Sequence, residues 1–514
     1  MRRLGLTVSL LASSCLAGMA AAEDHSRIVE EPLELTIHFH SDLTQGYEED
    51  FPVEQKAREL TGIHLVDQTS GRNTANTLEA TNLLLAQGGM PDIVGGLLIK
   101  QVVNEYGPQG AFQPLNDLIE EHAPHIKALL DERPDIAKSI TAYDGNIYYI
   151  PYVPDGKYGR AYFVRQDWLD KLGLGQPDTV DELYEVLVAF RDRDPNGNGK
   201  QDEVPFFVRH WEEAVRLVTL WDGRTSGSDT FHDFLVEDGR IVHPYAMETY
   251  RDGLAEVARW YAEGLIDKEV FTRGRSARDF LLSGDLGGMT HDWFASTSGY
   301  NAHLADDIEG FNFIPFLPPK TISGRRIEEH RRIPVKPDGW AISHTNDHPV
   351  ETIKYFDFWF SEQGKLLSNF GVEGDSWDMI DGEPVFKDVV LSGTEPINTH
   401  LRNIGAQLKK GFAQDYRYEW QWTAEGARKG IELYETEDLL VDQFLGVALT
   451  KEEQEVYDRY WHAILVYMLE RQQAWFLGTG DVKADWDDYV AALKSKGYDK
   501  VMEVMNAAYQ RQYG

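Results

Sequence analysis

The chain has 514 residues, and its 85 Asp and Glu outnumber its 50 Lys and Arg to give a formal net charge of −35. Such an acidic excess argues against a nucleic-acid-binding protein and against a polybasic membrane-surface protein, because both classes bind phosphates through Lys and Arg. Hydrophobic residues make up 42% of the chain, so we expect packed cores rather than disorder, divided among two to four domain-sized units.

The first 22 residues have the pattern of a secretory signal peptide. Arg2 and Arg3 precede a short apolar run, and three alanines end at Ala22 as a small-residue cleavage site. Cleavage there would remove Cys15, the one cysteine of the chain, and would change the formal charge from −35 to −37 because two arginines leave. A disulfide within the chain is therefore excluded.

Two other interpretations of this segment remain. The run that ends at Cys15 resembles a lipoprotein processing site, although Ala12 and the short apolar run ahead of it fit that site less well. The apolar run is also too short to favour a transmembrane anchor. The sequence therefore predicts export to the periplasm by a cleaved signal peptide.

Strand and helix patterns alternate along the first hundred residues and continue beyond them. Segment 33–40, for example, alternates apolar and polar residues as a half-buried strand does. Strands that alternate with helices indicate a mostly parallel α/β sheet. The predicted strands are 33–40, 63–66 and 91–96, and the predicted helices are 53–60, 77–87, 180–191, 249–263, 349–361 and 451–476.

Segment 192–203 places oxygen donors at alternate positions, with glycines for a tight turn, as Ca²⁺ sites do. One register starts at Asp192 and completes the EF-hand pattern, and the other starts at Asp194. A predicted helix enters the loop in both registers, but Pro205 opposes a helix that leaves it, which favours a single structural calcium loop over a paired sensor. The alternative is a solvated turn rich in Asp and Asn.

Tryptophan and tyrosine gather beside polar residues in four places, away from obvious core stripes. A sugar ring has an apolar face that an aromatic ring covers and a polar rim that Asp, Glu, Asn, Arg and Ser can bind. These clusters therefore suggest a carbohydrate site, and the alternative for any single Trp is core packing. The clusters are 148–152, 291–296, Trp377 and 416–422.

Signals for catalysis are weaker. His38 and His40 share one face of a strand, which would allow metal binding but more often marks satisfied polar positions. His291 and Asp292 are adjacent in sequence, which does not give an acid–base pair its facing geometry. The chain has no phosphate loop, nucleophile elbow or HExxH motif, whereas a glycosidase-type carboxylate pair stays open among so many acidic residues.

Ten blocks spread over the chain resemble the periplasmic alginate oligosaccharide-binding proteins, which are the solute-binding components of an ABC importer. They belong to the large extracellular solute-binding family that includes the maltose binders. The blocks are GAFQPLN (110–116), APHIKA (123–128), DGNIYYIPYVPDG (144–156), DPNGNGKQDEVPF (194–206), EGLIDKEVFTR (263–273), THDWFAST (290–297), PDGWAI (337–342), SNFGV (368–372), YEWQWT (418–423) and AYQRQYG (508–514).

The resemblance implies an α/β fold of two lobes with a hinge and an interlobe cleft, the periplasmic solute-binding protein fold. We expect the signal peptide at 1–22 and the N-terminal lobe at 23–152, with a returning segment at about 293–340. The C-terminal lobe is expected at 153–292 and 341–514, with the calcium loop at 194–203.

The resemblance also implies the ligand and metal residues. It places stacking aromatics at Tyr152, Trp293 and Trp422, and contacts to sugar hydroxyls or carboxylates at Ser296 and Tyr418; Asp292 and Glu419 lie in the same blocks. It implies one Ca²⁺ and favours the second register of the loop. The calcium donors are then Asp194, Asn196, Asn198, the Lys200 carbonyl, Asp202 and Glu203.

Two departures from the family pattern concern the charge of the site. Lys336 and Trp420 stand where the resemblance leads us to expect arginines, and lysine lacks the bidentate fork of arginine. Arg160 and Arg165 are the remaining candidate carboxylate partners, with a structural ion pair as the alternative. A local cluster of cations matters here, because the net charge of the protein would repel an anionic ligand at long range.

The sequence and the resemblance together predict a monomeric, non-enzymatic binding protein that captures alginate oligosaccharides and delivers them to an inner-membrane ABC permease. One alternative is a different acidic or neutral oligosaccharide on the same scaffold. The other is a secreted polysaccharide lyase or glycosidase.

Overall fold

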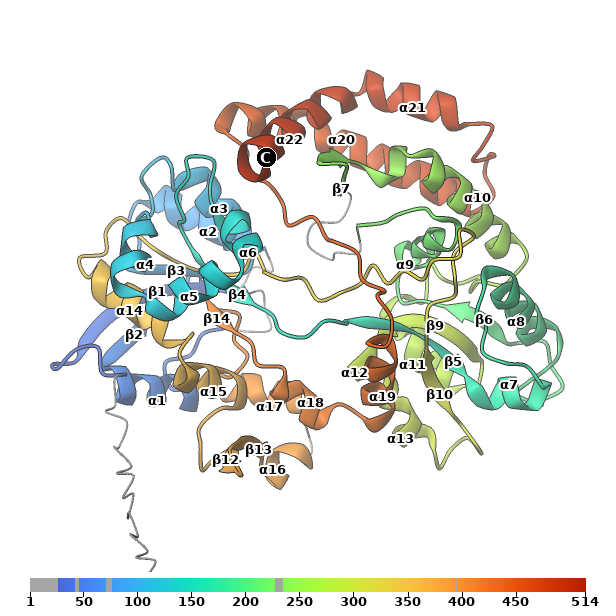
Figure 1. Cartoon of the computed structure of the whole chain (residues 1–514), viewed down its shortest axis with the longest axis horizontal. Coiled ribbons are helices and arrows are strands. Elements are labelled where there is room, and N and C mark those ends of the chain that lie inside the picture. Colours follow the sequence, from blue (N-terminus) through green and yellow to red (C-terminus); the bar gives the residue numbers. More distant parts are fainter. Residues whose placement is uncertain (1–25, 42–45, 71–75, 227–233, 394) are drawn as a thin grey trace, which may run out of the picture.

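The structure is a computed structural model that describes residues 26–41, 46–70, 76–226, 234–393 and 395–514. The predicted signal peptide and the lipoprotein alternative at Cys15 lie outside these residues. Two lobes stand side by side, each built on its own sheet (Figure 1). Among the described helices, none combines the length and the apolar character needed to cross a bilayer.

The first lobe contains a six-stranded sheet with the order β14-β4-β11-β3-β1-β2. β1 is parallel to both β2 and β3, whereas β11 is antiparallel to β3 and β4. β11 runs in the opposite direction because the chain enters it on its way back from the second lobe. The strands are β1 Leu33–His40, β2 Ile63–Asp67, β3 Ile93–Gly96, β4 Ile150–Val153, β11 Gly339–Ile342 and β14 Phe412–Ala413.

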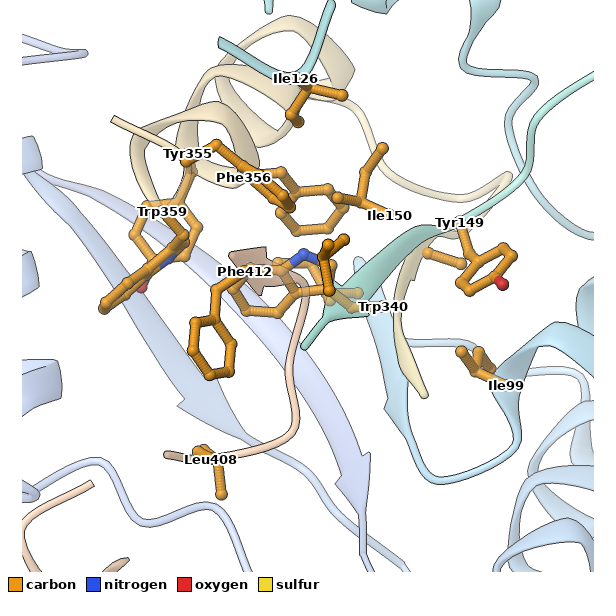
Figure 2. Packing of buried hydrophobic residues seen from close by; sticks show 14 of the residues in the cluster. Ile99, Ile126, Tyr149, Ile150, Trp340, Tyr355, Phe356, Trp359, Leu408 and Phe412 are labelled. Carbon is orange, nitrogen blue, oxygen red and sulfur yellow. The ribbon is translucent and has the colours of Figure 1, made fainter. Parts of the chain in front are cut away.

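The core of this lobe is rich in aromatic rings from β11 and the helix α14 (Figure 2). Trp340 stacks on Phe356 with ring centroids 4.4 Å apart, and the Lys410 ammonium lies over Trp359 while pairing with Glu54 at 2.5 Å. The helices are α1 Pro52–Thr61, α2 Thr77–Gln87, α3 Ile99–Tyr106, α4 Asn116–His122, α5 Pro124–Glu132, α6 Pro134–Ile140, α14 Pro349–Phe358, α15 Glu362–Phe370, α16 Asp388–Leu391, α17 Ile397–Asn403 and α18 Arg417–Trp422; a hairpin of β12 Trp377–Ile380 and β13 Glu383–Phe386 lies beside them.

The second lobe contains a four-stranded sheet with the order β10-β5-β9-β6. Its strands are β5 Arg160–Arg165, β6 Val204–Phe207, β9 Gly287–Trp293 and β10 Phe313–Phe316, and a separate ribbon pairs β7 Leu235–Glu237 with β8 Arg240–Val242. The helices are α7 Gln166–Leu172, α8 Val180–Asp192, α9 Trp211–Val215, α10 Glu248–Ala262, α11 Ala277–Ser283, α12 Phe294–Ser298, α13 Tyr300–Leu304, α19 Glu425–Tyr434, α20 Lys451–Phe476, α21 Trp486–Ser495 and α22 Tyr498–Tyr513; 3₁₀ turns cover Arg216–Trp221, Pro244–Ala246 and Gly274–Ser276.

The chain passes between the two lobes three times. The crossing segments are 154–159, 317–338 and 423–424, the last of which joins α18 to α19. The C-terminal helices α20 to α22 belong to the second lobe and extend along one side of the molecule toward the first (Figure 1). There the Gln512 amide donates to the Lys138 carbonyl at 2.6 Å, which ties α22 to α6. Several chain crossings at one place are the usual construction of a hinge.

The predicted elements match the observed ones closely, but two broader expectations do not. The sheets are mixed rather than mostly parallel, because strands that follow a crossing enter their sheet from the far side. The sheets also divide the chain differently from the expected segments. β10, within the expected returning segment 293–340, belongs to the second sheet, whereas residues 349–413 pack in the first lobe.

Candidate functional site

A pocket of about 710 Å³ lies between the lobes, where two of the crossings run side by side. The crossing segments 154–158 and 331–334 form its floor, α6 adds residues of the first lobe, and α19 adds residues of the second. Its lining is Arg133, Asp135, Pro154, Asp155, Gly156, Lys157, Tyr158, Arg331, Arg332, Ile333, Pro334, Tyr416, Ile431 and Glu435. A pocket shared by two hinged lobes is a typical place for a ligand.

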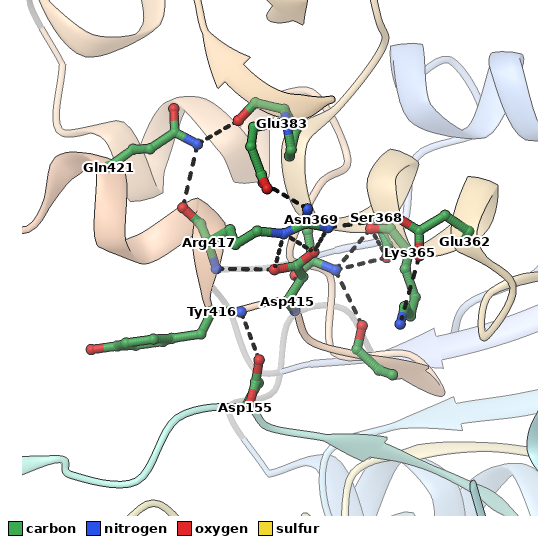
Figure 3. Close-up of polar contacts among 12 residues, drawn as sticks. Asp155, Glu362, Lys365, Ser368, Asn369, Glu383, Asp415, Tyr416, Arg417 and Gln421 are labelled. Atoms are coloured by element: carbon green, nitrogen blue, oxygen red, sulfur yellow. Dashed lines mark hydrogen bonds and ion pairs between the residues drawn. The ribbon is translucent and has the colours of Figure 1, made fainter. Parts of the chain in front are cut away.

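The short helix α18 is fixed in place by polar contacts at both ends (Figure 3). Arg417 pairs with Asp415 at 2.6 Å and with Glu383 of β13 at 2.9 Å. Gln421 bonds the backbone of the same hairpin, accepting from Phe386 N–H at 2.9 Å. Rigid support of this kind holds the remaining side chains of α18 in one orientation.

Four predicted residues lie together on the first-lobe side of this region. The Tyr152 ring stacks on a core phenylalanine of β14 with centroids 4.9 Å apart, and Tyr418 lies with its ring 6.4 Å from that of Trp422. Glu419 accepts a hydrogen bond from Arg332 of the second crossing. Burial raises the pKa of both tyrosines, so each hydroxyl stays protonated and able to donate. The buried Trp422 Nε1–H has no hydrogen-bond partner in the part of the chain that the structure describes.

Lys336 is held next to this group by its backbone. Its N–H donates to the Tyr152 carbonyl at 3.0 Å, which places the second crossing directly beside β4. The side chain is half-buried.

The other four predicted residues lie on the second lobe: Asp292 and Trp293 at the end of β9, Arg160 opposite them at the start of β5, and Ser296 in α12. Trp293 is 37% exposed, and the Arg160 guanidinium covers one ring face at 4.7 Å from the centroid. Asp292 is buried and pairs with Arg209 and Arg278, each at 2.9 Å.

Arg278 also reaches Ser296, donating to its hydroxyl at 2.9 Å. One Nη1 therefore serves an aspartate, a serine and the neighbouring Thr297. Because the guanidinium links β9 with α12, it sets the orientation of the polar groups next to the exposed tryptophan.

Positive charge exceeds negative charge around Trp293. Arg160 pairs with Glu213 at 2.6 Å, and Arg209 bridges Glu213 and Asp292 at 4.0 and 2.9 Å. Counting Arg278, three guanidinium groups share two carboxylates. Burial by itself would raise the pKa of Glu213, but the Arg160 charge and hydrogen bond outweigh it and lower the value to about 2. The cluster therefore keeps a formal charge of one positive unit.

None of the predicted ligand residues is among the residues that line the pocket between the lobes, and several other candidates from the sequence have structural roles. Arg165 is fully buried and pairs with Asp167 at 2.7 Å and Asp285 at 2.6 Å, so the alternative of a structural ion pair is correct for it. Trp377 is buried and donates to a backbone carbonyl at 2.9 Å, as a core residue does. His38 and His40 are buried on one face of β1, where His40 contacts the Thr77 hydroxyl at 2.9 Å.

Four arginines at the site were missed by the sequence analysis. They are Arg209, Arg278, Arg331 and Arg332. Arg331 lines the pocket, its Nε has no hydrogen-bond partner, and within the described residues it forms no ion pair. An isolated arginine has no spacing pattern that would mark it as part of a site. The family blocks at 290–297 and 337–342 were the sequence features that indicated a binding site near these arginines.

The predicted calcium loop joins α8 to β6. Asp194 takes a left-handed conformation with φ 48°, and the glycines at 197 and 199 have φ 75° and 79°. The Asp194 carboxylate accepts backbone N–H groups of Asn198 and Gly199 at 3.0 and 2.9 Å, which closes the loop on itself. The chain leaves the loop as a strand that begins at Val204. This agrees with the prediction that Pro205 disfavours a helix directly after the loop.

Glu203 is the unusual residue of this loop. Its carboxylate is buried, and among the described residues neither oxygen has a hydrogen-bond partner. Burial raises its pKa, and the charges of Asp194 and Asp202 add to the effect. A buried carboxylate without a donor is costly unless a cation accompanies it, so the donor set fits a divalent cation. Asp192 is instead occupied by Arg191 through both oxygens, at 2.7 and 2.8 Å, which favours the register that starts at Asp194.

The sequence and the fold are both similar to those of known binding proteins. A model of the bacterial extracellular solute-binding protein family matches residues 40–366. The solved structure of the alginate-binding protein AlgQ2 without calcium ion is 47% identical, with a TM-score of 0.81, over 95% of this chain and 99% of that one. The fructooligosaccharide ABC transporter substrate-binding protein FusA of Streptococcus pneumoniae is 24% identical over 89% of this chain and 86% of its own length, and Lipoprotein LipO of Bacillus subtilis is 24% identical over 84% and 83%.

Proposed function

The chain belongs to the bacterial extracellular solute-binding protein family, and we propose that it captures alginate-type oligosaccharides between its lobes and delivers them to an inner-membrane ABC permease. The observation that carries this proposal is the excess of guanidinium groups around the exposed ring of Trp293. An acidic sugar offers an apolar ring face and a carboxylate side by side. The ring face suits the tryptophan, and the carboxylate suits the arginines. The relationship to the alginate-binding protein AlgQ2 supports the same choice.

The first-lobe wall supplies the opposite side of the ligand in this proposal. Tyr152 and Trp422 offer ring faces, and the neutral Tyr418 hydroxyl and the free Trp422 N–H offer donors for hydroxyl or carboxylate oxygens. Arg332 contacts this side directly through Glu419, Arg331 lines the adjacent pocket, and Lys336 is joined to β4 by its backbone. Glu419 serves as the partner that orients Arg332 rather than as a direct ligand.

Closure of the lobes would follow from how the ligand is shared. A ligand that contacts both walls binds the closed state better than the open one and so shifts the population toward it. Gly156 in the first crossing has φ 90°, and a Cβ there would lie 3.0 Å from Arg332 Nε and from the Tyr416 ring. Because the two crossing segments pack this closely, a movement of one segment during lobe closure would displace the other.

The strongly negative protein can still bind an anion through this site. Repulsion from distant carboxylates is screened over about 8–10 Å at ordinary ionic strength. Within that distance of Trp293, the positively charged cluster sets the local potential. The net charge of the protein then affects mainly its solubility, and the arginines determine which ligand binds.

We also propose a calcium ion in the 194–203 loop. The donors would be Asp194, Asn196, Asn198, the Lys200 carbonyl, Asp202 and Glu203, and the ion would neutralise the carboxylates and fix the loop between α8 and β6. Its role would be structural. Export to the periplasm by cleavage after Ala22, a monomeric state and the lack of turnover complete the proposal.

A neutral oligosaccharide is the second candidate ligand. The Arg332 charge is matched by Glu419, and Lys336 replaces an arginine, so the first-lobe wall by itself suits an uncharged sugar as well. A ligand panel separates the two. Tryptophan fluorescence is titrated with oligosaccharides from alginate, pectin, a glycosaminoglycan and fructan, and each mixture is then checked for new reducing ends. Saturable binding of the alginate series without turnover is expected. Saturation by the fructan series alone supports the neutral ligand, and turnover refutes the binding role.

Substitution of the arginines beside Asp292 tests the source of selectivity. Arg209→Gln and Arg278→Gln are each expected to weaken uronate binding roughly 10- to 100-fold, because a charge-assisted hydrogen bond contributes about 1.5–3 kcal/mol. Arg273→Gln is the matched control, since Arg273 pairs with Asp267 at 2.9 Å and covers Phe280 in the same lobe. Equal losses in all three variants, measured by calorimetry, would assign the effect to stability instead of recognition.

A further inference from the structure

A second group of metal-binding side chains lies behind the ligand wall of the second lobe. His291 belongs to β9, two residues before Trp293, and Glu328 and His330 belong to the crossing 317–338. His291 Nε2 is 3.0 Å from one Glu328 oxygen, and His330 Nδ1 is 3.8 Å from the other. All three residues are buried. One donor atom from each can be chosen so that all three atoms lie within 4.8 Å of one another.

The three side chains face a small internal cavity. Its volume is about 20 Å³, and its lining includes Tyr162 and Thr219 as well as these three residues. A space of this size holds one water molecule or one ion. His330 Nε2 is buried and has no hydrogen-bond partner within the described ranges of the chain. The cavity is therefore lined by a histidine that has one ring nitrogen unsatisfied there.

The charges around the cavity leave one carboxylate without arginine. Glu213 pairs with Arg160, and Glu329 pairs with Arg224 at 2.5 Å. In the part of the chain that the structure describes, the ion pairs of Glu328 are with the two imidazoles alone. Arg216 also lines the cavity, and with Arg160 and Arg224 it balances the formal charges of Glu213, Glu328 and Glu329. The ligand chemistry of Glu328 and the two imidazoles, and not an excess of negative charge, is therefore what favours a metal ion.

We propose that His291, Glu328 and His330 bind one divalent transition-metal ion, with Zn²⁺ as the best match. Two imidazoles and a carboxylate form a common zinc ligand set, in which a water molecule takes the fourth position. Imidazole nitrogen selects transition metals over Ca²⁺, which takes oxygen donors. The site is therefore chemically distinct from the 194–203 loop.

Modest side-chain movement brings the donors to bonding distance. Ligands about 2.1 Å from a tetrahedral ion are roughly 3.4 Å apart, so the widest separation must close by about 1.4 Å. Rotation of the imidazoles, which stand with their centroids 5.4 Å apart, supplies movement of this size. The ion would join β9, which ends in Asp292 and Trp293, to the crossing that carries Arg331 and Arg332.

The test uses the metal alone. The protein, prepared without a polyhistidine tag and kept in excess Ca²⁺, is titrated with Zn²⁺ by calorimetry and with Co²⁺ by visible absorption. We expect about one high-affinity equivalent of Zn²⁺ and a Co²⁺ spectrum of a four-coordinate site. X-ray absorption of the zinc-loaded protein should show two imidazole ligands. Absence of a stoichiometric site, or a zinc shell without imidazole, would overturn the proposal even if no variant could be made.

Variants assign the site to these residues. His330→Gln and His291→Gln are expected to weaken Zn²⁺ binding at least 100-fold, whereas His303→Gln, at an exposed histidine of α13 in the same lobe, leaves it unchanged. Glu203→Gln alters the calcium loop and should also leave zinc binding unchanged. Circular dichroism melting confirms that each variant is folded. Zinc binding that survives in both His291→Gln and His330→Gln would place the metal elsewhere.

Discussion

Trp293→Ala is expected to weaken oligosaccharide binding about 30-fold or more while the protein stays folded. The ring is 37% exposed at the end of β9, and one face is already covered by Arg160, so its other face is free to stack on a sugar. A buried aromatic anchor at a binding site contributes about 2 kcal/mol or more when it is truncated. Calorimetry on wild type and variant measures the change, and Trp293→Phe should retain part of the affinity because a smaller ring still stacks.

The matched control for this substitution is Phe280→Ala. Phe280 is an exposed ring of the same lobe that also carries an arginine, Arg273, over one face at 4.9 Å. Its removal deletes the same kind of arginine–aromatic contact outside the site. Loss of affinity in both variants would point to a general effect on the lobe, and an unchanged affinity in Trp293→Ala would remove the tryptophan from the proposed site.

Glu203→Gln is expected to change stability in opposite directions with and without calcium. With Ca²⁺ at 100 times its dissociation constant, the ion stabilises the wild-type protein by about 2.7 kcal/mol, which corresponds to roughly 2–3 °C in melting temperature when a chain of this length unfolds cooperatively. The variant lacks a charged ligand and should lose most of this gain. In chelator, the order reverses, because the variant no longer buries a carboxylate that has no donor.

The pH dependence follows from the same residue. The pKa of Glu203 in the calcium-free folded protein is raised, mainly by burial, so protonation stabilises the folded state. The calcium-free protein should therefore lose stability as pH rises through this raised pKa, and Glu203→Gln should remove that loss. Melting curves in chelator at a series of pH values measure it. An identical pH profile in wild type and variant would contradict the account.

Asp192→Asn separates the two registers of the loop. Asp192 is occupied by Arg191, and the register that starts at Asp194 does not use it. Calcium affinity is expected to stay within a few-fold of wild type in Asp192→Asn, while Asp194→Asn and Glu203→Gln reduce it strongly. A large loss in Asp192→Asn would restore the EF-hand register.

Local patterns in the sequence predicted single elements well. The 26-residue helix α20 was predicted with its observed bounds, and the structure adds that Thr450 caps it with Glu453 in a capping box. β1 was likewise predicted at 33–40, where apolar and polar residues alternate. Propensity and periodicity act over a few residues, and these elements depend on little else.

The path of the chain between the lobes could not be predicted in the same way. β11 and β10 are both short apolar strands, yet one joins the first sheet and the other the second. An apolar strand carries no mark of the sheet it enters, because that choice depends on tertiary packing. The hinge was therefore predicted from the family resemblance. The predicted assignment of chain segments to the two lobes differs from the observed one.

The candidate site divides along similar lines. Its aromatic residues were found because Trp and Tyr stood in polar surroundings, and their roles as ligand contacts remain predictions. Arg209 and Arg278 were not found, since their partner Asp292 is 83 and 14 residues away along the chain. Arg165 was nominated from the same strand as Arg160, but the alternation of β5 sends the two toward different carboxylates, Glu213 and Asp285.

The most direct test of the proposed function compares an alginate oligosaccharide with its carboxyl-reduced, neutral counterpart of the same length. Both are titrated into the calcium-loaded protein by calorimetry, at low and at high salt. The arginine cluster around Trp293 predicts that the uronate binds at least 100-fold more tightly than the reduced sugar, and that the difference narrows as salt increases. Equal affinity for the two sugars, or binding of the reduced sugar alone, would contradict a binding protein for acidic oligosaccharides.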